Sequence, residues 1–195
     1  ELDEFIDRVI VPLEQEDDNI RFFDHRRENE RTDWDREGLP NHEWELLLHR
    51  VKRLADEAGV YRYPFPPEFG GRNGTNLGMA VIREHLAHRG LGLHNDLQNE
   101  HSIVGNNVGL LLMLHYGTEE QKAQWIDDLA EGKRGFAFGI TEPKHGSDAT
   151  HMETTAVKDG EEWIINGEKI WNTGIHNAQY DMVMARTSGK AGDAA

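Results

Sequence analysis

The sequence predicts an α+β fold in which an α-helical bundle precedes an antiparallel β-meander or barrel domain. Apolar residues recur at helical spacing over residues 1–134, and large and small residues alternate over residues 135–195. The dipeptides Asp159-Gly160 and Asn166-Gly167 add strong signals for two-residue turns between strands. We therefore expect a helical domain over residues 1–134 and the start of a β-domain over residues 135–195.

We expect five helices in the first domain. Gly59 and Gly90 follow the second and third of them, where a residue in the left-handed conformation commonly ends a helix. Thr118 and Gln121 are spaced as a capping box, in which each side chain binds the backbone N–H of the other residue. The connections are short, which favours packing as a bundle. The expected helices span residues 2–13, 42–59, 75–90, 101–117 and 118–133.

Two segments of the helical domain lack a regular apolar pattern. Residues 14–41 are dense in both positive and negative charges, and we interpret them as a solvated excursion of helix and loop. Residues 63–74, with the sequence YPFPPEFGGRNG, are rich in proline and glycine. This composition predicts a rigid, extended connector.

The composition restricts the possible partners. Lys and Arg number 21 against 36 Asp and Glu, so the formal net charge is −15. Such a surface repels phosphate backbones and anionic lipid, which argues against nucleic acid and membranes as partners. Cysteine is absent, which removes thiol catalysis and thiolate metal ligation. No apolar run approaches the length of a membrane span, and we expect a soluble cytoplasmic protein.

The two ends of the sequence suggest processing or truncation. The chain begins at Glu1 without a methionine, which is compatible with removal of an upstream segment. It ends in RTSGKAGDAA, a stretch typical of a flexible tail or of a cut within a longer protein.

The two turn dipeptides also predict the strand register of the β-domain. A turn centred on Asp159-Gly160 pairs Ala156 with Trp163, and one centred on Asn166-Gly167 pairs Trp163 with Ile170. These apolar residues would share one face of the sheet and form its core.

The opposite face of the same strands carries Trp171 and Thr173, two residues apart. An indole beside a hydroxyl suits a flat aromatic ligand with polar edges. The ordinary alternative is a core tryptophan next to a strand-forming threonine. On the first strand, Ala137, Gly139 and Thr141 form a nearly flat face on which a thin ligand could also lie.

The loop after the first strand, KHGSD, offers backbone N–H groups and the hydroxyl of Ser147 to anionic oxygens. Gly, Ser and Asp are equally the residues of ordinary turns. A second polar cluster comprises His94, Asp96, Glu100 and His101, which are residue types that bind zinc or iron. Their spacing fits no HExxH arrangement, so we assign no metal site and interpret them as surface residues.

Taken together, FAFGITEPKHGSDATHMETTAV, DGEEWIINGEKIWNTG and YDMVMART resemble the flavin-binding core of the acyl-CoA dehydrogenase family. The shared pattern is TEPxxGSD, a strand, NGxKxW and a closing strand that ends in AR. Upstream, PEFGG and YGTEEQKAQWIDDLAEGKRGFAFGITEP resemble the family's N-terminal helical domain. The resemblance implies a truncated chain without the family's C-terminal four-helix domain. The charged segment 14–41 and KHGSDATH resemble a divergent branch with a longer N-terminal region.

The resemblance implies FAD-dependent α,β-dehydrogenation of an acyl-CoA thioester, with an electron-transfer flavoprotein as acceptor and a homodimer or homotetramer as the intact form. No catalytic residue is implied within this chain, because the family's base is a Glu of the C-terminal domain. Glu142 would belong to the binding loop instead. Ser147, Asn95 and Gln98 would contact the acyl-CoA substrate. The implied FAD-binding residues are Phe138, Ile140 and Thr141 along the ring, Gly146 and Ser147 near the phosphates, Trp171 against the flavin, and Thr173 near its N5.

Two other functions share these residues. Acyl-CoA oxidases and flavin monooxygenases have the same scaffold, and nothing in the sequence separates them from dehydrogenases. A non-catalytic accessory chain would instead pair with a partner through the strand edge that an incomplete β-domain leaves open. By itself, the chain is expected to bind FAD poorly and to turn nothing over.

Overall fold

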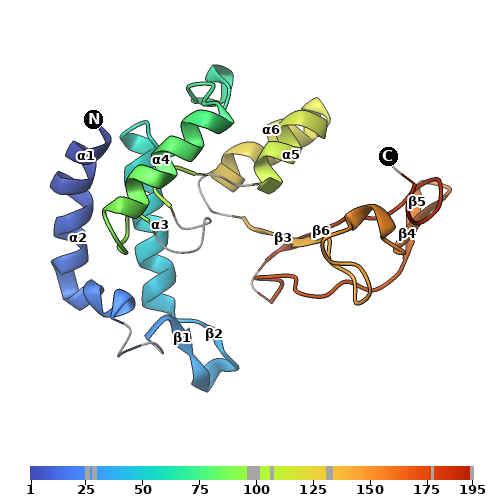
Figure 1. Ribbon diagram of the computed structural model, residues 1–195, viewed down its shortest axis with the longest axis horizontal. Coiled ribbons are helices and arrows are strands. Elements are labelled where there is room, and N and C mark those ends of the chain that lie inside the picture. The colour runs from blue at the N-terminus through green and yellow to red at the C-terminus, as the bar shows by residue number, and fades with distance from the viewer. Residues whose placement is uncertain are drawn as a thin grey trace. The chain divides into compact units, whose positions relative to one another are not determined.

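The computed structural model describes residues 1–24, 27, 30–95, 102–105, 108–130, 134–176 and 178–193. The chain divides into two compact units, Glu1–Lys133 and Arg134–Ala195. Helices dominate the first unit and strands the second, as the colour sequence from blue to red in Figure 1 shows. The predicted fold class, helices followed by strands, is confirmed.

The first unit is built from short and long helices that match four of the expected segments closely. The expected first helix is a continuous run of α1, a π-helical turn over Ile6–Ile10, and α2, with Pro12 tolerated in the first turn of α2. The expected fourth helix is α5, which spans Val108–Tyr116 within the predicted segment 101–117. The α-helices are α1 (Leu2–Phe5), α2 (Val11–Gln15), α3 (His42–Glu57), α4 (Asn76–His88), α5 (Val108–Tyr116) and α6 (Glu119–Ala130).

The core of this unit forms where α3 packs against the N-terminal helices and α4. Asn41 caps α3 by accepting the backbone N–H of Glu43 at 2.8 Å, and Gly59 follows its end with a φ of 71°. One face of α3 is buried, and Leu86 of α4 is fully buried against the same cluster. The buried cluster comprises Ile6, Ile10, Leu13, Phe22, Trp44, Leu47, Leu48, Val51, Ala55, Val60, Tyr61, Leu86, Leu93, Ile103 and Val104.

The charged segment 14–41 is not merely solvated, which corrects the sequence-based interpretation. It contains a 3-10 segment (Glu16–Phe23) and the two-residue strands β1 (Thr32–Asp33) and β2 (Leu39–Pro40), which pair antiparallel. Phe22 is 4% exposed, and its ring centroid lies 5.1 Å from that of Trp44 in α3. The guanidinium of Arg31 stacks over the same indole at 4.6 Å. The segment is therefore anchored in the core by aromatic residues.

The connector over residues 63–74 is irregular, as predicted, but it turns back on itself rather than running extended. A 3-10 turn spans Pro67–Phe69, and the N–H of Gly71 donates to the carbonyl of Pro66 at 3.1 Å. Phe65 at the start of this turn is 1% exposed. The connector thus inserts an aromatic residue into the interior through a tight backbone reversal.

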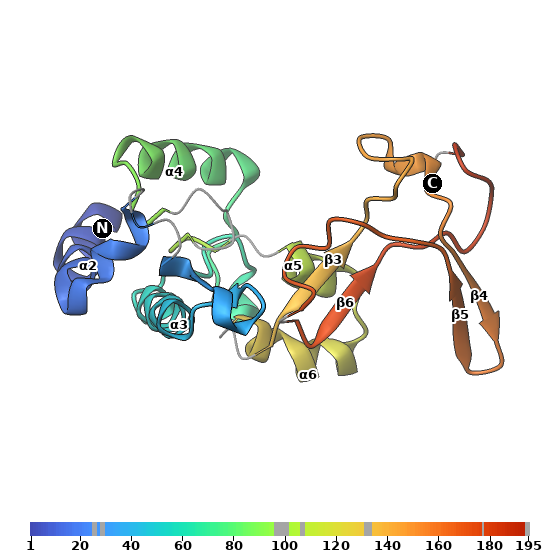
Figure 2. The same ribbon diagram turned by 90° about the horizontal axis from the view of Figure 1, so that it is seen from below.

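The second unit contains two separate strand pairs. In Figure 2, β3 lies beside β6, and β4 lies beside β5. β3 (Phe136–Gly139) pairs parallel with β6 (Tyr180–Val183), and β4 (Thr155–Asp159) pairs antiparallel with β5 (Glu162–Asn166). The predicted antiparallel meander is therefore correct for the β4–β5 hairpin only.

The hairpin register differs from the prediction by two residues. Asp159 pairs with Glu162, so the turn is centred on Gly160 and Glu161, and Ala156 faces Ile165 instead of Trp163. A shift of two leaves every side chain on its predicted face. The predicted second hairpin does not form, because residues 167–170 lie outside any strand.

The capping box at the start of α6 is expected to stabilise the protein, and a single substitution can test this. The Thr118 hydroxyl accepts the N–H of Gln121 at 3.2 Å, and the Gln121 side chain accepts the N–H of Thr118 at 2.9 Å, as predicted. Thr118→Ala is expected to lower the free energy of unfolding by about 1 kcal/mol, measured by urea titration. Thr187→Ala, at an exposed position outside any helix, is the control. Equal stability of the two variants would contradict a stabilising cap.

Candidate functional site

A tight turn at Glu142 shapes the loop that follows β3. The backbone of Glu142 and that of His145 exchange two hydrogen bonds, each of 3.1 Å, around Pro143. Gly146 and Ser147 follow this turn and are both exposed. Nothing lies within 4 Å of the place where a Cβ of Gly146 would stand, so the backbone there is open to a close approach.

The side chain of Glu142 is buried and heavily bonded. It is 4% exposed and accepts the backbone N–H of Glu153 at 2.6 Å and that of Thr154 at 2.9 Å. The Lys169 ammonium lies 2.9 Å from its Oε1 and also donates to the Ile140 carbonyl at 3.1 Å.

These contacts decide the protonation state of Glu142. Burial by itself raises the pKa of the carboxyl, but the two backbone amides and the Lys169 ammonium outweigh that effect and hold the pKa at about 2. A carboxylate so acidic and so fully bonded is unsuited to accept a proton from carbon. Glu142 is thus a structural anion, in agreement with its expected place in the binding loop.

The segment that carries Trp171 and Thr173 is attached to the end of β3. The N–H of Ile170 donates to the Thr141 carbonyl at 2.9 Å, which brings the start of this segment to the residues that follow Gly139. Trp171 has a φ of 61° and is 82% exposed. The prediction that Trp171 and Thr173 share a strand face is wrong, because both lie outside any strand and the N–H of Thr173 bonds to the Trp171 carbonyl at 2.8 Å.

The backbone of Trp171 is unusual in a way that points to function. A bulky residue in the left-handed region costs free energy, and an indole left in water forgoes the gain of burial. Strained residues of this kind cluster at ligand sites. The observation therefore favours a binding role for Trp171 over the alternative of an ordinary core tryptophan.

The face of β3 that carries Ala137 and Gly139 is covered, which corrects the expectation of a flat, open floor. Asn172 and Asp181 lie over it, joined by a hydrogen bond of 2.9 Å from the Asn172 amide to the Asp181 carboxylate. A Cβ on Gly139 would come within 2.8 Å of the Asn172 nitrogen. Glycine is required here because the two polar side chains pack against its backbone.

Sequence reasoning missed Asn172 and Asp181, although both bear on ligand chemistry. Among the described residues, nothing donates a hydrogen bond to the buried Oδ1 atoms of these two side chains. Both atoms are acceptors, and a buried acceptor without a donor costs free energy until one arrives. Asn172 lies between Trp171 and Thr173, the two predicted flavin-binding residues, and that position could have identified it.

The predicted site residues are brought together in part. Ile140 and Thr141 at the end of β3 meet the 170–173 segment through the Thr141–Ile170 bond, whereas Phe138 lies within β3 and is half-buried. Asn95 is half-buried in the helical unit, in a turn closed by its own N–H bond to Gly92 at 3.0 Å. Gln98 lies outside the described residues, as do Asp96, Glu100 and His101. Within the described part of the chain, no group of His, Asp and Glu is arranged to hold a metal ion.

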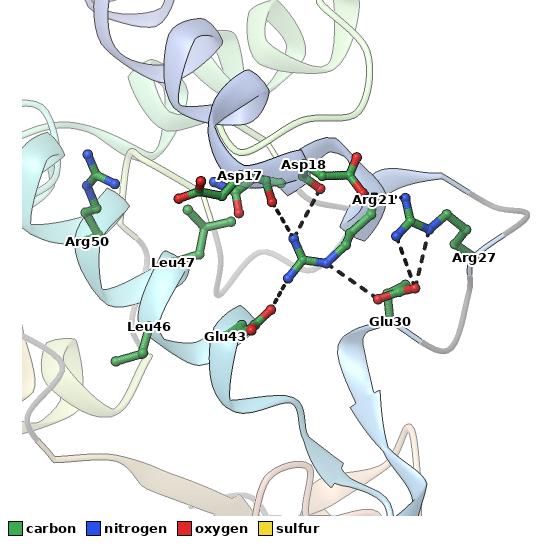
Figure 3. Close-up of a pocket in the computed structure, with 10 residues that line it drawn as sticks. Asp17, Asp18, Arg21, Arg27, Glu30, Glu43, Leu46, Leu47 and Arg50 are labelled. Carbon is green, nitrogen blue, oxygen red and sulfur yellow. Dashed lines mark hydrogen bonds and ion pairs between the residues drawn. The ribbon is translucent and has the colours of Figure 1, made fainter.

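A surface pocket of the helical unit contains none of the predicted site residues. It lies between the charged segment and α3, and two of its three arginines, Arg21 and Arg27, are paired with acidic residues of the same lining (Figure 3). Arg21 contacts Glu43 and Glu30, and Arg27 binds Asp18 at 2.8 Å. The ion pair of Arg21 with Glu43 ties the charged segment to α3, so the pocket is best described as an ion-pair cluster. Its lining comprises Asp17, Asp18, Asn19, Arg21, Arg27, Glu30, Glu43, Leu46, Leu47 and Arg50.

The chemistry of the site in the β unit suits a flat aromatic group with N–H donors on its edge. The exposed indole of Trp171 can stack on such a ring, and the buried Oδ1 atoms of Asn172 and Asp181, in the segments beside it, lack a hydrogen-bond donor among the described residues. The open backbone at Gly146 admits anionic oxygens. The residues present therefore fit one side of a site for a nucleotide cofactor with a planar ring.

The sequence comparisons identify the family. Residues 3–133 match the profile of the acyl-CoA dehydrogenase N-terminal domain, and residues 137–195 match that of the acyl-CoA dehydrogenase middle domain. The chain belongs to the acyl-CoA dehydrogenase family, as its motifs indicated. The described helices include none long and apolar enough to cross a membrane.

Individual relatives agree with this assignment. The chain is 36% identical over 145 residues to the probable acyl-CoA dehydrogenase YngJ of Bacillus subtilis, an alignment that covers 73% of this chain and 36% of that protein. A putative acyl-CoA dehydrogenase from Mycobacterium abscessus has a similar structure, with a TM-score of 0.62, 30% identity, and coverage of 89% of this chain and 40% of that chain. A chain of the electron transferring flavoprotein structure from Acidaminococcus fermentans has a TM-score of 0.56, 28% identity, and coverage of 96% and 42%. The chain spans 25%, 36% and 33% of the length of the first three curated relatives.

Proposed function

We propose that this chain supplies part of the FAD and CoA site of an acyl-CoA dehydrogenase, which forms an α,β double bond in an acyl-CoA thioester. Residues 1–134 would be its N-terminal helical domain, and residues 135–195 the start of its flavin-binding middle domain. The observation that carries the proposal is the junction at Thr141 and Ile170, which gathers the strand end, the loop after Glu142 and the strained Trp171. Family membership supplies the reaction class.

The residues of the chain would bind and orient rather than transfer protons. Trp171 would stack on the flavin ring, and Thr173 would direct its hydroxyl to the ring edge. Phe138, Ile140 and Thr141 would line the ring, while Gly146 and Ser147 would meet the phosphates and the CoA chain. FAD, when bound, supplies the acceptor for the β-hydride.

The remaining roles would be shared between residues of the helical unit and other parts of the full-length protein. The catalytic base would be a Glu of the C-terminal domain, which agrees with the fully bonded state of Glu142. Asn95 and Gln98 would touch the acyl group. An electron-transfer flavoprotein would accept the electrons, and the intact enzyme would be a cytoplasmic homodimer or homotetramer, without nucleic acid or membrane partners. The acidic composition supports these partner exclusions.

One observation favours the accessory-chain alternative enough to test it. Trp163, Ile164 and Ile165 on β5 are 54%, 49% and 52% exposed, so both faces of the β4–β5 hairpin present apolar surface. In the full-length protein, yellow flavin that stays bound through purification would support the enzyme. A colourless full-length protein that recovers no flavin absorbance on incubation with FAD would support the accessory role.

Substitutions at Trp171 and Thr173 test the site in the full-length protein. Trp171→Ala is expected to weaken FAD binding by about two- to tenfold, because a ring contact of about 0.5–1.5 kcal/mol is lost. Thr173→Val is expected to slow flavin reduction by acyl-CoA, since a hydrogen bond to the ring edge disappears. FAD affinity is measured by fluorescence titration and reduction by stopped-flow absorbance.

The control for these variants is Trp34→Ala, which removes another exposed tryptophan, at 68% exposure, in the helical unit. It is expected to leave both measurements unchanged. Wild-type FAD affinity and wild-type reduction in both site variants would refute the assignment.

A further inference from the structure

We propose that Glu142 and Lys169 form a positioning pair whose buried contact fixes the loop over residues 143–152 and the segment that carries Trp171, and thereby sets the affinity for FAD. Neither side chain would touch the cofactor. The inference rests on the proposed function, because it assigns the pair a role in the same site.

Three backbone groups bind this pair. The carboxylate of Glu142 holds the N–H groups of Glu153 and Thr154, which follow the loop, while the Lys169 ammonium holds the carbonyl of Ile140, at the end of β3. The contact between the two charges, at 2.9 Å, joins residues 27 positions apart in sequence. One ion pair therefore closes the loop at its base and connects it to the later segment.

The position of Lys169 links the pair to Trp171. Lys169 immediately precedes Ile170, whose N–H bonds to the Thr141 carbonyl, and Trp171 follows. The Lys169 ammonium and the Ile170 N–H are both bound to residues that follow β3. These contacts fix the backbone immediately before Trp171. A strained residue persists only where its surroundings over-determine the backbone. The contacts of the Lys169 ammonium and the bond from the Ile170 N–H to Thr141 are two such restraints.

The Glu142–Lys169 pair is shielded from solvent. The side chains of Lys169 and Glu142 are 7% and 4% exposed, so solvent does not substitute for either charge. A buried ion pair adds little net stability compared with neutral residues, but removal of one partner leaves an uncompensated charge. Another ion pair of the loop, Lys144 with Glu153, is 72% and 54% exposed and is screened by water. The contact of His151 with Asp148 is also exposed. The buried pair is therefore the shielded ionic contact at the start of the loop, while the Arg186 guanidinium donates to the carbonyls of Thr150 and Met152 at its end.

The test compares Glu142→Gln, Lys169→Met and the double variant in the full-length protein. Three quantities are measured: FAD affinity, hydrogen exchange of the peptide covering residues 143–152 in the flavin-free protein, and the thermal unfolding midpoint. Each single variant is expected to raise exchange in this loop and to weaken FAD binding by about tenfold, the worth of one hydrogen bond to a charged group.

The double variant separates positioning from stability. Because it leaves no charge unpaired, it is expected to recover most of the unfolding midpoint that either single variant loses. Loop exchange and FAD affinity are expected to stay impaired, because the fixed contact is still missing. Lys158→Met and Glu162→Gln, on the exposed hairpin, are matched controls expected to change none of the three quantities.

Two results would overturn the inference. In one, the double variant restores loop protection and FAD affinity together with the midpoint, which would make the pair merely structural. In the other, the single variants leave loop exchange at the wild-type level. Failure of the proposed function is distinguishable, because the wild-type protein would then bind no FAD while the exchange experiment would still report on the loop.

Discussion

Gly71→Ala is expected to lower the free energy of unfolding by about 3 kcal/mol, the upper range for inserting a methyl group into a filled space. The added Cβ would stand 2.6 Å from the Cα of Phe65 and closer still to its carbonyl group. Relief requires backbone movement, because the obstructing atoms belong to the main chain. That movement is opposed by the Gly71–Pro66 hydrogen bond and by the burial of the Phe65 ring.

The measurement is chemical denaturation of the full-length protein, followed by a signal from the helical unit such as far-ultraviolet circular dichroism. Gly135→Ala is the matched control, since its new Cβ would meet only the Gln179 side chain, at 4.0 Å. The control is expected to change stability by less than about 0.5 kcal/mol. A Gly71→Ala protein as stable as the control would show that the connector shifts at little cost.

Local signals in the sequence predicted much of the fold. The capping box at Thr118 and the cap glycine at Gly59 depend on residues within one turn of each other, and both appear as expected. The charged segment was misread because a long charged pattern concealed Phe22, whose burial depends on Trp44 in a different helix. Composition alone does not report such a distant contact.

Long-range bonds also explain the errors in the β unit. Asn166-Gly167 has the composition of a hairpin turn, but the N–H of Ile170 is bonded to Thr141 instead of to β5. The parallel pairing of β3 with β6 joins two strands that are far apart in sequence. Parallel strands are not connected by a tight turn, so no turn dipeptide in the sequence indicates this pairing. In both cases the observed backbone pairing depends on contacts between residues that are distant in sequence.

The candidate site was proposed from resemblance more than from residue patterns, and its ligand-binding role stays a prediction. The motif placed Thr141 and Trp171 in one site, and the structure joins their segments. The polar groups that organise the site were missed, because the partners of Lys169 and Asp181 come from distant positions. The available sign was Lys169 directly before the apolar residues Ile170 and Trp171, since a lysine that is buried requires an anionic partner.

Acid is expected to destabilise the β unit through Glu142. The pKa of this carboxyl is about 2 in the folded chain, against its ordinary value of 4.5. Between these values the unfolded chain binds the proton more readily, so the stability contributed by Glu142 is fully present above about pH 4.5 and is lost as the pH falls towards 2. The loss corresponds to about 3 kcal/mol over the whole window.

Comparison with Glu142→Gln isolates this contribution, since the amide does not titrate. Asp148 also has a lowered pKa, held down by hydrogen bonds from Thr150 and His151, but it is exposed and is present in both proteins. The difference in unfolding free energy between wild type and variant is therefore expected to shrink steadily from about pH 5 to about pH 3. Glu161→Gln, at an exposed turn position, should parallel the wild type throughout. A wild-type advantage over Glu142→Gln that stayed constant across this range would mean that Glu142 is not held as a buried anion, and the positioning pair would lose its electrostatic basis.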